Sequence, residues 1–125
     1  MLTTIATVLA GLIGAAIILV GVRAFWAPQA AVDFGIPDTP TQDRSFQAWL
    51  HVKAVRDIAC GLFTFILMAG ATPRLLGCFM LAAAAIPVGD AAIVLRSNGP
   101  KVAVYAIHGA TAAVMLIISV LLLAA

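Results

Sequence analysis

Residues 3–25, TTIATVLAGLIGAAIILVGVRAF, decide the class of fold. The run is apolar from Ile5 to Val22 and meets its first charge only at Arg23. A helix needs about 20 apolar residues to cross the hydrocarbon core of a bilayer. A signal peptide would have a basic amino-terminal region and a shorter apolar core. We therefore interpret this run as a membrane span of the mature protein.

The composition of the whole chain agrees with a membrane protein. Of the 125 residues, 64% are hydrophobic and only 10% are charged, whereas about a quarter of the residues in a soluble domain are charged. The net charge of +2 is small, and no basic patch resembles a nucleic-acid-binding surface. We expect one transmembrane domain over residues 1–125 that contacts membrane lipid and binds no nucleic acid.

Three further apolar stretches complete the predicted spans. The second must reach upstream of its charged residues to be long enough, with Thr39 as N-cap and Pro40 at the first helical position. The third opens at Thr72 and Pro73, and Pro87 is expected to bend it. The predicted spans cover about residues 3–25, 42–70, 73–96 and 100–124.

The connections between the spans favour a compact bundle. The turns GATPR and RSNGPK are short, and short links place successive helices antiparallel and side by side. The longer first connection predicts a short interfacial helix from Pro28 to Phe34, closed by Gly35, with Trp26 and Phe34 at headgroup depth. The predicted fold is all-α: an antiparallel four-helix membrane bundle with a short interfacial helix between the first two spans.

Lys and Arg residues are distributed unevenly between the two ends of the predicted bundle. The end that holds the first and third loops carries four of them, Arg23, Arg44, Arg96 and Lys101, and the other end carries Arg74. Loops rich in Lys and Arg stay in the cytoplasm. We therefore expect cytoplasmic first and third loops and non-cytoplasmic termini.

Three spans carry an ionisable residue at a similar predicted depth. Asp57, Asp90 and His108 each lie roughly 9 to 11 Å below an interfacial residue of their own helix. A charge in hydrocarbon costs at least ~2.5 kcal/mol, so such residues face the bundle interior or a wet cavity and usually pair. The shared depth predicts one polar pocket that opens toward the cytoplasmic leaflet.

Helical spacing predicts which other side chains join this pocket. One stripe of the second span joins residues three or four apart: Trp49, Lys53, Arg56, Asp57, Cys60 and Thr64. A similar stripe of the fourth span joins Tyr105 and His108. We expect the pocket to hold Arg56, Asp57, Asp90, Tyr105 and His108. Tyr105, Trp49, Lys53 and Thr64 are the predicted substrate contacts.

A structural interpretation of the same residues stands beside this one. Lys53 and Asp57 lie four residues apart and can neutralise each other, and Arg56 can snorkel to the interface. Asp90 can form a pair with Arg96 or His108 that fixes the helix register. Ionisable residues inside a membrane bundle are nevertheless functional by default.

Other chemistries lack the residues that they need. Cys60 and Cys78 form no CxxC motif, and two distant histidines make no recognisable metal site. We expect no metal and no cofactor. The chain contains no Glu, so it lacks the carboxylate that small multidrug exporters carry in their first helix. That span has Gly11, Gly14 and Gly21 instead, which predict close helix packing, with a homo-oligomer through this face as one outcome.

Four motifs carry a family resemblance: FWAPQAAVDFGIP, VKAVRDIACGL, GDAAIVLRSNG and HG. They resemble the landmarks of a family of small four-span membrane proteins of bacteria and fungi that is classed as a domain of unknown function. The resemblance covers nearly the whole chain and implies that Arg56, Asp57, Gly89, Asp90 and His108 occupy landmark positions. It implies no reaction.

The predicted pocket favours acid–base catalysis, because two carboxyl groups in contrasting environments supply an acid and a base at one pH. We expect a cofactor-independent enzyme that acts on a lipophilic small molecule, by epoxide opening, isomerisation, or cyclisation of a terpenoid or polyketide. Asp90 is the expected general acid, Asp57 the general base and Arg56 the residue that orients Asp57. Tyr105 and His108 would orient the substrate or relay protons.

Two other classes of function stay open. The acids can belong to a proton-coupled carrier that works as an oligomer, or the chain can be a non-catalytic accessory subunit whose polar residues fix the helix register. A pocket closed on the non-cytoplasmic side favours the enzyme. A water path to both faces favours the carrier, and a filled core with every charge paired favours the accessory subunit.

Overall fold

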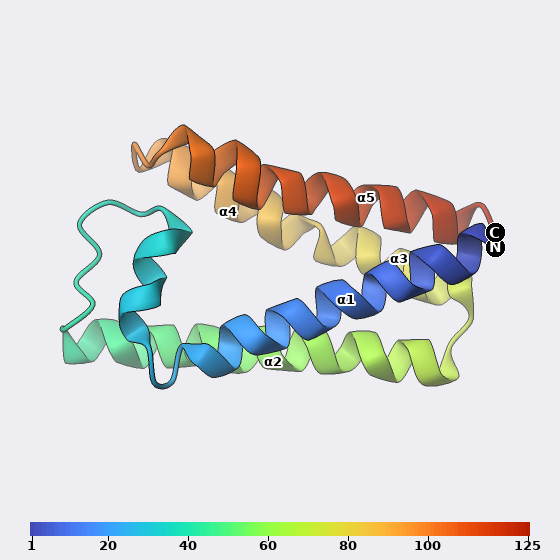
Figure 1. Ribbon diagram of the computed structural model, residues 1–125, viewed down its shortest axis with the longest axis horizontal. Coiled ribbons are helices and arrows are strands. Elements are labelled where there is room, and N and C mark those ends of the chain that lie inside the picture. Colours follow the sequence, from blue (N-terminus) through green and yellow to red (C-terminus); the bar gives the residue numbers. More distant parts are fainter.

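The fold is entirely helical. A computed structural model describes all 125 residues and contains no strand. The helices are α1 (Leu2–Arg23), the 3-10 helix η1 (Pro28–Phe34), α2 (Arg44–Gly70), α3 (Pro73–Ala83), α4 (Ala85–Arg96), the π-helix η2 (Val102–Gly109) and α5 (Ala110–Leu123). They form long rods, with both termini at one end and η1 at the other (Figure 1). The predicted all-α fold is confirmed.

Three helical segments are long and apolar enough to cross a membrane: Leu2–Arg23, Pro73–Arg96 and Val102–Leu123. The second segment consists of α3 and α4, and the third consists of η2 and α5. The helix α2 is the longest single helix but is not among them, because Lys53, Arg56 and Asp57 interrupt its apolar part. The membrane character of the chain therefore rests on the other three segments.

The predicted start of the third span is confirmed, whereas that of the second is wrong. The Thr72 hydroxyl accepts a hydrogen bond from a backbone N–H of the first turn of α3 at 3.2 Å. In α2 the N-cap is Asp43, whose carboxylate accepts from the backbone N–H of Phe46 at 2.7 Å. The Thr39 hydroxyl instead donates to the Ile36 carbonyl. A better cap nearer the apolar run therefore sets the boundary.

The third predicted span is broken next to Pro87. A proline has no N–H to donate, and its ring crowds the carbonyl four residues earlier. That carbonyl belongs to Ala83, the last residue of α3, and α4 resumes at Ala85. The expected bend is therefore present. The π-helix η2 was not expected; its hydrogen bonds join residues five apart, so its turns are wider than those of an α-helix.

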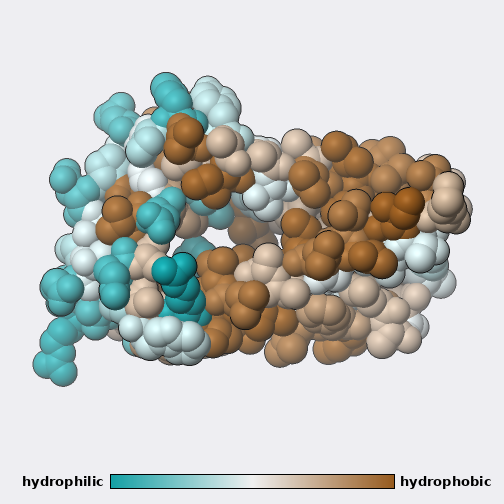
Figure 2. Space-filling view, viewed as in Figure 1, coloured by the Kyte–Doolittle hydropathy of each residue, from teal (hydrophilic) through white to brown (hydrophobic).

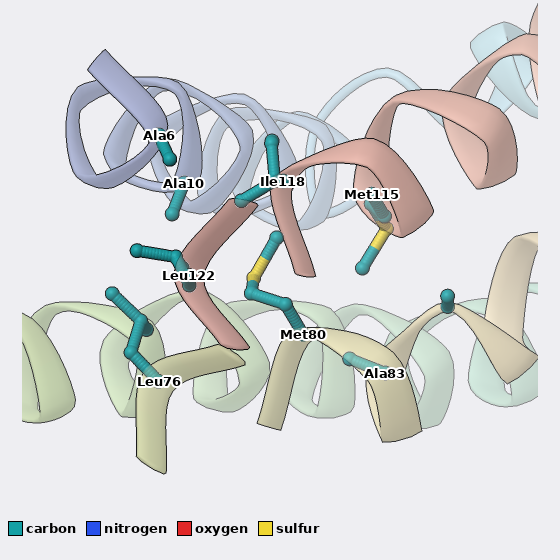
Figure 3. Close-up of a cluster of buried hydrophobic side chains, with 9 residues drawn as sticks. Ala6, Ala10, Leu76, Met80, Ala83, Met115, Ile118 and Leu122 are labelled. Carbon is teal, nitrogen blue, oxygen red and sulfur yellow. The ribbon is translucent and has the colours of Figure 1, made fainter. Parts of the chain in front are cut away.

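Apolar side chains fill the half of the molecule near the termini. Figure 3 shows side chains of α1, α3 and α5 directed into one cluster: Ala6, Ala10, Leu76, Met80, Ala83, Met115, Ile118 and Leu122. Inside the same region the Ser119 hydroxyl donates to the Gly77 carbonyl at 2.9 Å, which ties α5 to α3. The cluster therefore packs α1, α3 and α5 together at this end of the bundle.

Glycines let α1 and α2 approach each other closely. A Cβ atom on Gly61 would lie 2.5 Å from the Gly14 carbonyl oxygen and would overlap the Ile18 side chain. A Cβ on Gly21 would lie 2.8 Å from the Ala54 carbonyl oxygen. The close packing predicted for the small residues of α1 is therefore confirmed, and α2 of the same chain covers this face.

The segment between α1 and α2 folds over the opposite end of the molecule. The predicted helix has the expected bounds, Pro28–Phe34, and ends at Gly35, whose φ of 108° is left-handed. A Cβ on Gly99 would overlap the Gly35 carbonyl oxygen, so the two loops touch through glycines. Trp26 is exposed as expected. Phe34 instead turns inward, which corrects its predicted position at headgroup depth.

Candidate functional site

The polar part of the molecule lies at the end opposite the termini. Figure 2 shows hydrophilic residues gathered at this end, apolar residues over the rest, and a hollow between the two regions. Here α2 packs on α1 and α4 packs on η2, whereas α2 and α4 scarcely touch. The two pairs of helices therefore separate, and η1 lies across the gap between them (Figure 1).

Four ionisable side chains on three helices meet at this level, and we call them the polar cluster: Lys53, Asp57, Asp90 and His108. Asp90 lies on α4, which packs on η2, the helix that carries His108. The helix α2, which carries Lys53 and Asp57, makes little direct contact with α4. That Asp57, Asp90 and His108 share one pocket at a common depth stays a prediction.

Lys53 and Asp57 form the ion pair of the cluster. The Lys53 Nζ lies 2.6 Å from Asp57 Oδ2, one helical turn along α2. Asp57 is buried, and the Lys53 ammonium also lies 5.4 Å from the centroid of the Phe34 ring. A partner carboxylate and an aromatic face both stabilise an ammonium group at a partly desolvated position. The mutual neutralisation considered for this pair is therefore present.

The tautomer of His108 follows from its hydrogen bond. His108 is 7% exposed, and its Nε2 lies 2.8 Å from the carbonyl oxygen of Phe34. A carbonyl oxygen only accepts, so we assign the proton to Nε2, which leaves Nδ1 with a free lone pair in the neutral ring. The Phe34 ring holds the imidazole from the side, with centroids 4.4 Å apart and planes inclined at 52°.

The second ring nitrogen of His108 is not fully buried. It makes no hydrogen bond, and no buried side-chain nitrogen or oxygen in the molecule lacks a partner. Nδ1 therefore cannot be one of the buried atoms. The ring is thus packed and oriented on one edge, and Nδ1 on the other edge has no hydrogen-bond partner.

Asp90 is the unpaired carboxyl group of the cluster. It is half-buried, and the only ion pair in the molecule joins two other residues. Neither of its carboxylate oxygens makes a hydrogen bond, and the pairs considered with Arg96 or His108 are not formed. Asp90 therefore has neither an ion-pair partner nor a hydrogen-bond partner.

Two residues expected in the pocket lie outside it. Arg56 is exposed, and its guanidinium donates to the Val52 carbonyl of its own helix at 3.1 Å, so it does not orient Asp57. Tyr105 is 61% exposed. Arg56 directly precedes Asp57 in the chain, and adjacent helical residues point about 100° apart.

The other predicted substrate contacts lie in three different places: on the surface, in the contact between α1 and α2, and in the polar cluster. Trp49 is 71% exposed, away from the cluster. Thr64 is buried, but it packs on Gly14 of α1 and its hydroxyl donates to the Cys60 carbonyl. Lys53 alone of these contacts joins the cluster.

Phe34 is the component of the site that sequence reasoning missed. Its carbonyl, its ring and its place beside Lys53 join η1 to both α2 and η2. No periodicity relates residues 34 and 108, which are 74 positions apart. The signal in the sequence is an aromatic residue at the end of a short helix. Such a residue also suits the membrane interface, which is the position that the sequence predicts for Phe34.

The comparison with known families covers almost the whole of this structure. Residues 14–122 match the family model described as Domain of unknown function (DUF4267). The chain belongs to this family. The DUF4267 match includes every member of the polar cluster and confirms the resemblance of the four motifs to a domain of unknown function. No curated protein and no solved structure shows a detectable similarity to the chain.

The chemistry available to this DUF4267 protein is proton exchange. Asp90 can give or take a proton, the free Nδ1 of His108 can accept one, and the Lys53–Asp57 pair contributes two fixed charges of opposite sign. The structure contains no group of three or more His, Cys, Asp or Glu side chains that could hold a metal ion.

Proposed function

We propose that the chain crosses a bilayer four times, as an antiparallel bundle in which α2 is the fourth span. With 27 residues, α2 is about 40 Å long, and Figure 1 shows it running beside α1. Its buried acid is neutralised by Lys53, which lowers the cost of placing α2 in hydrocarbon. The concentration of Lys and Arg at the η1 end supports cytoplasmic first and third loops and non-cytoplasmic termini.

Within this bundle the protein acts as a cofactor-independent enzyme that performs acid–base chemistry on a lipophilic substrate. One observation carries this proposal: a carboxyl group on α4 and an imidazole nitrogen on η2, neither with a hydrogen-bond partner, lie on two packed helices of an otherwise apolar molecule. Asp90 is the general acid. His108 Nδ1 takes the role of general base, because Asp57, the base expected from the sequence, is bound to Lys53.

The structure supports the enzyme over the two other classes in specific ways. The apolar cluster near the termini closes the bundle on the side away from the hollow, which argues against a path through a single chain. Asp90 has no partner, whereas an accessory subunit with a purely structural polar cluster would pair its acids. The hollow between helix pairs suits a molecule that enters sideways from the lipid.

Native mass spectrometry with lipid extraction tests the proposal. The gently purified wild type is compared with Asp90→Asn, His108→Gln and a matched control, Asp33→Asn, at an exposed carboxylate of η1. We expect a lipophilic molecule that co-purifies with the wild type and the control and is lost or reduced in the two cluster variants.

The extracted compound then defines the assay. Incubation with the wild type should convert it or release it as a product, and Asp90→Asn should abolish that conversion. If all four proteins are empty and equally stable, the enzyme proposal fails and the accessory role is favoured. If the compound moves across vesicle membranes without chemical change, the carrier is favoured.

A further inference from the structure

The polar cluster also constrains the substrate, through the charges that it holds. The ammonium of Lys53 is already engaged by Asp57 at 2.6 Å and by the face of the Phe34 ring. The groups left free are the Asp90 carboxyl and Nδ1 of His108. Any charged ligand must therefore either disrupt the ion pair or bind at the acid that catalysis requires.

In the state that begins the proposed reaction the cluster has no net charge. Asp90 carries the proton that it will donate, and His108 is neutral, with its proton on Nε2. Lys53 and Asp57 contribute one positive and one negative charge. A site of zero net charge in a region of low dielectric favours an uncharged ligand, because a lone charge there loses its hydration without gaining a partner.

Each charged alternative destroys part of this arrangement. A cationic head group would pair with ionised Asp90 and so remove the general acid. An anionic head group would compete with Asp57 for Lys53, and separating a buried pair leaves an uncompensated charge behind. We infer that the substrate is a neutral lipophile whose polar end is a carbonyl, epoxide or hydroxyl oxygen, bound between Asp90 and His108. This inference rests on the proposed function.

The two free groups also suit one kind of reaction. Asp90 donates its proton to the substrate, and His108 Nδ1 removes a proton from a neighbouring carbon, so that a double bond shifts. The products are a carboxylate and an imidazolium, and transfer of one proton from His108 to Asp90 restores the starting state. Atoms, electrons and protons balance without a co-reactant. Isomerisation therefore needs nothing beyond these two side chains.

Binding of three matched probes to the full chain in lipid nanodiscs tests the inference. The probes are dodecan-2-one, dodecylamine and dodecanoate, compared at equal mole fraction in the bilayer. The readout is the side-chain nitrogen resonances of 15N-histidine. His51 stacks on Phe25, outside the cluster, and serves as the internal reference.

We expect dodecan-2-one to shift the His108 Nδ1 resonance with saturation and to leave His51 unchanged. Its affinity should exceed that of either charged probe by about tenfold or more. Asp90→Ala should weaken ketone binding, and alanine is favourable in a helix, so the variant should fold. The inference is overturned if dodecylamine binds more tightly than dodecan-2-one and Asp90→Ala abolishes that binding. It is also overturned if dodecanoate binds more tightly than dodecan-2-one and Lys53→Gln abolishes that binding. Absence of binding by all three probes would contradict the proposed function itself.

Discussion

The contact between α1 and α2 gives the sharpest test of the fold, because the chain supplies a matched pair of glycines. Both Gly61 and Gly89 lie inside long helices. A Cβ on Gly61 would lie 2.5 Å from the Gly14 carbonyl oxygen, whereas a Cβ on Gly89 would meet nothing within 4 Å. The substitutions Gly61→Ala and Gly89→Ala therefore add the same methyl group to a closed site and to an open one.

The expected magnitudes follow from these contacts. Atoms in van der Waals contact lie about 3.5 Å apart, so α1 and α2 must separate by about 1 Å around Gly61. Overpacking of this kind lowers the free energy of unfolding by about 1–3 kcal/mol. The higher helix propensity of alanine raises it by roughly 1 kcal/mol relative to glycine. We expect a net loss of ~1 kcal/mol for Gly61→Ala and a gain of similar size for Gly89→Ala.

Thermal unfolding in detergent micelles, followed by tryptophan fluorescence, measures both variants against the wild type. The midpoint should fall for Gly61→Ala and rise for Gly89→Ala. Equal midpoints for the two variants would show that α1 and α2 do not approach through these glycines. That result would refute the packing on which the positions of Asp57 and Lys53 depend.

Three further predictions concern single contacts. Ser119→Ala removes a buried hydrogen bond between α5 and α3 and should cost about 1 kcal/mol. Thermal unfolding measures it against Thr111→Ala, whose hydroxyl bonds to the Ile107 carbonyl one turn earlier in the same helical segment. Asp57→Asn should destabilise the protein more than the double substitution with Lys53→Gln does, because the single change leaves a charge unpaired. Gly35→Ala should speed amide hydrogen exchange in η1, since its left-handed φ and a Cβ clash at 2.6 Å both oppose a side chain; unchanged exchange would contradict this.

Local signals in the sequence predicted much of the fold. The Thr72 cap, the bend before Pro87 and the short helix that ends at Gly35 each depend on the chemistry of a few adjacent residues. The start of α2 was misplaced because two acceptable caps compete there, and Asp43 lies closer to the apolar run.

The candidate site was predicted only in part, because side-chain direction depends on how each helix is rotated about its axis. The common depth of Asp57, Asp90 and His108 follows from helix rise alone, whereas their convergence on one pocket stays a prediction. Arg56 is adjacent to Asp57 in sequence but lies on another face of α2. Tyr105 lies in a π-helix, where residues three apart no longer stack as they do in an α-helix.

The glycine face of α1 also bears on how the chain enters a membrane during synthesis. On its own α2 is too polar to be a favourable insert, since it carries Lys53, Arg56 and Asp57 in its first half. The face of α2 that holds Asp57 and Gly61 is the one that α1 covers. In the proposed four-span bundle, release of α1 and α2 together as a preformed hairpin would keep that acid away from lipid. The glycines would then act as an assembly device before they act as a packing surface.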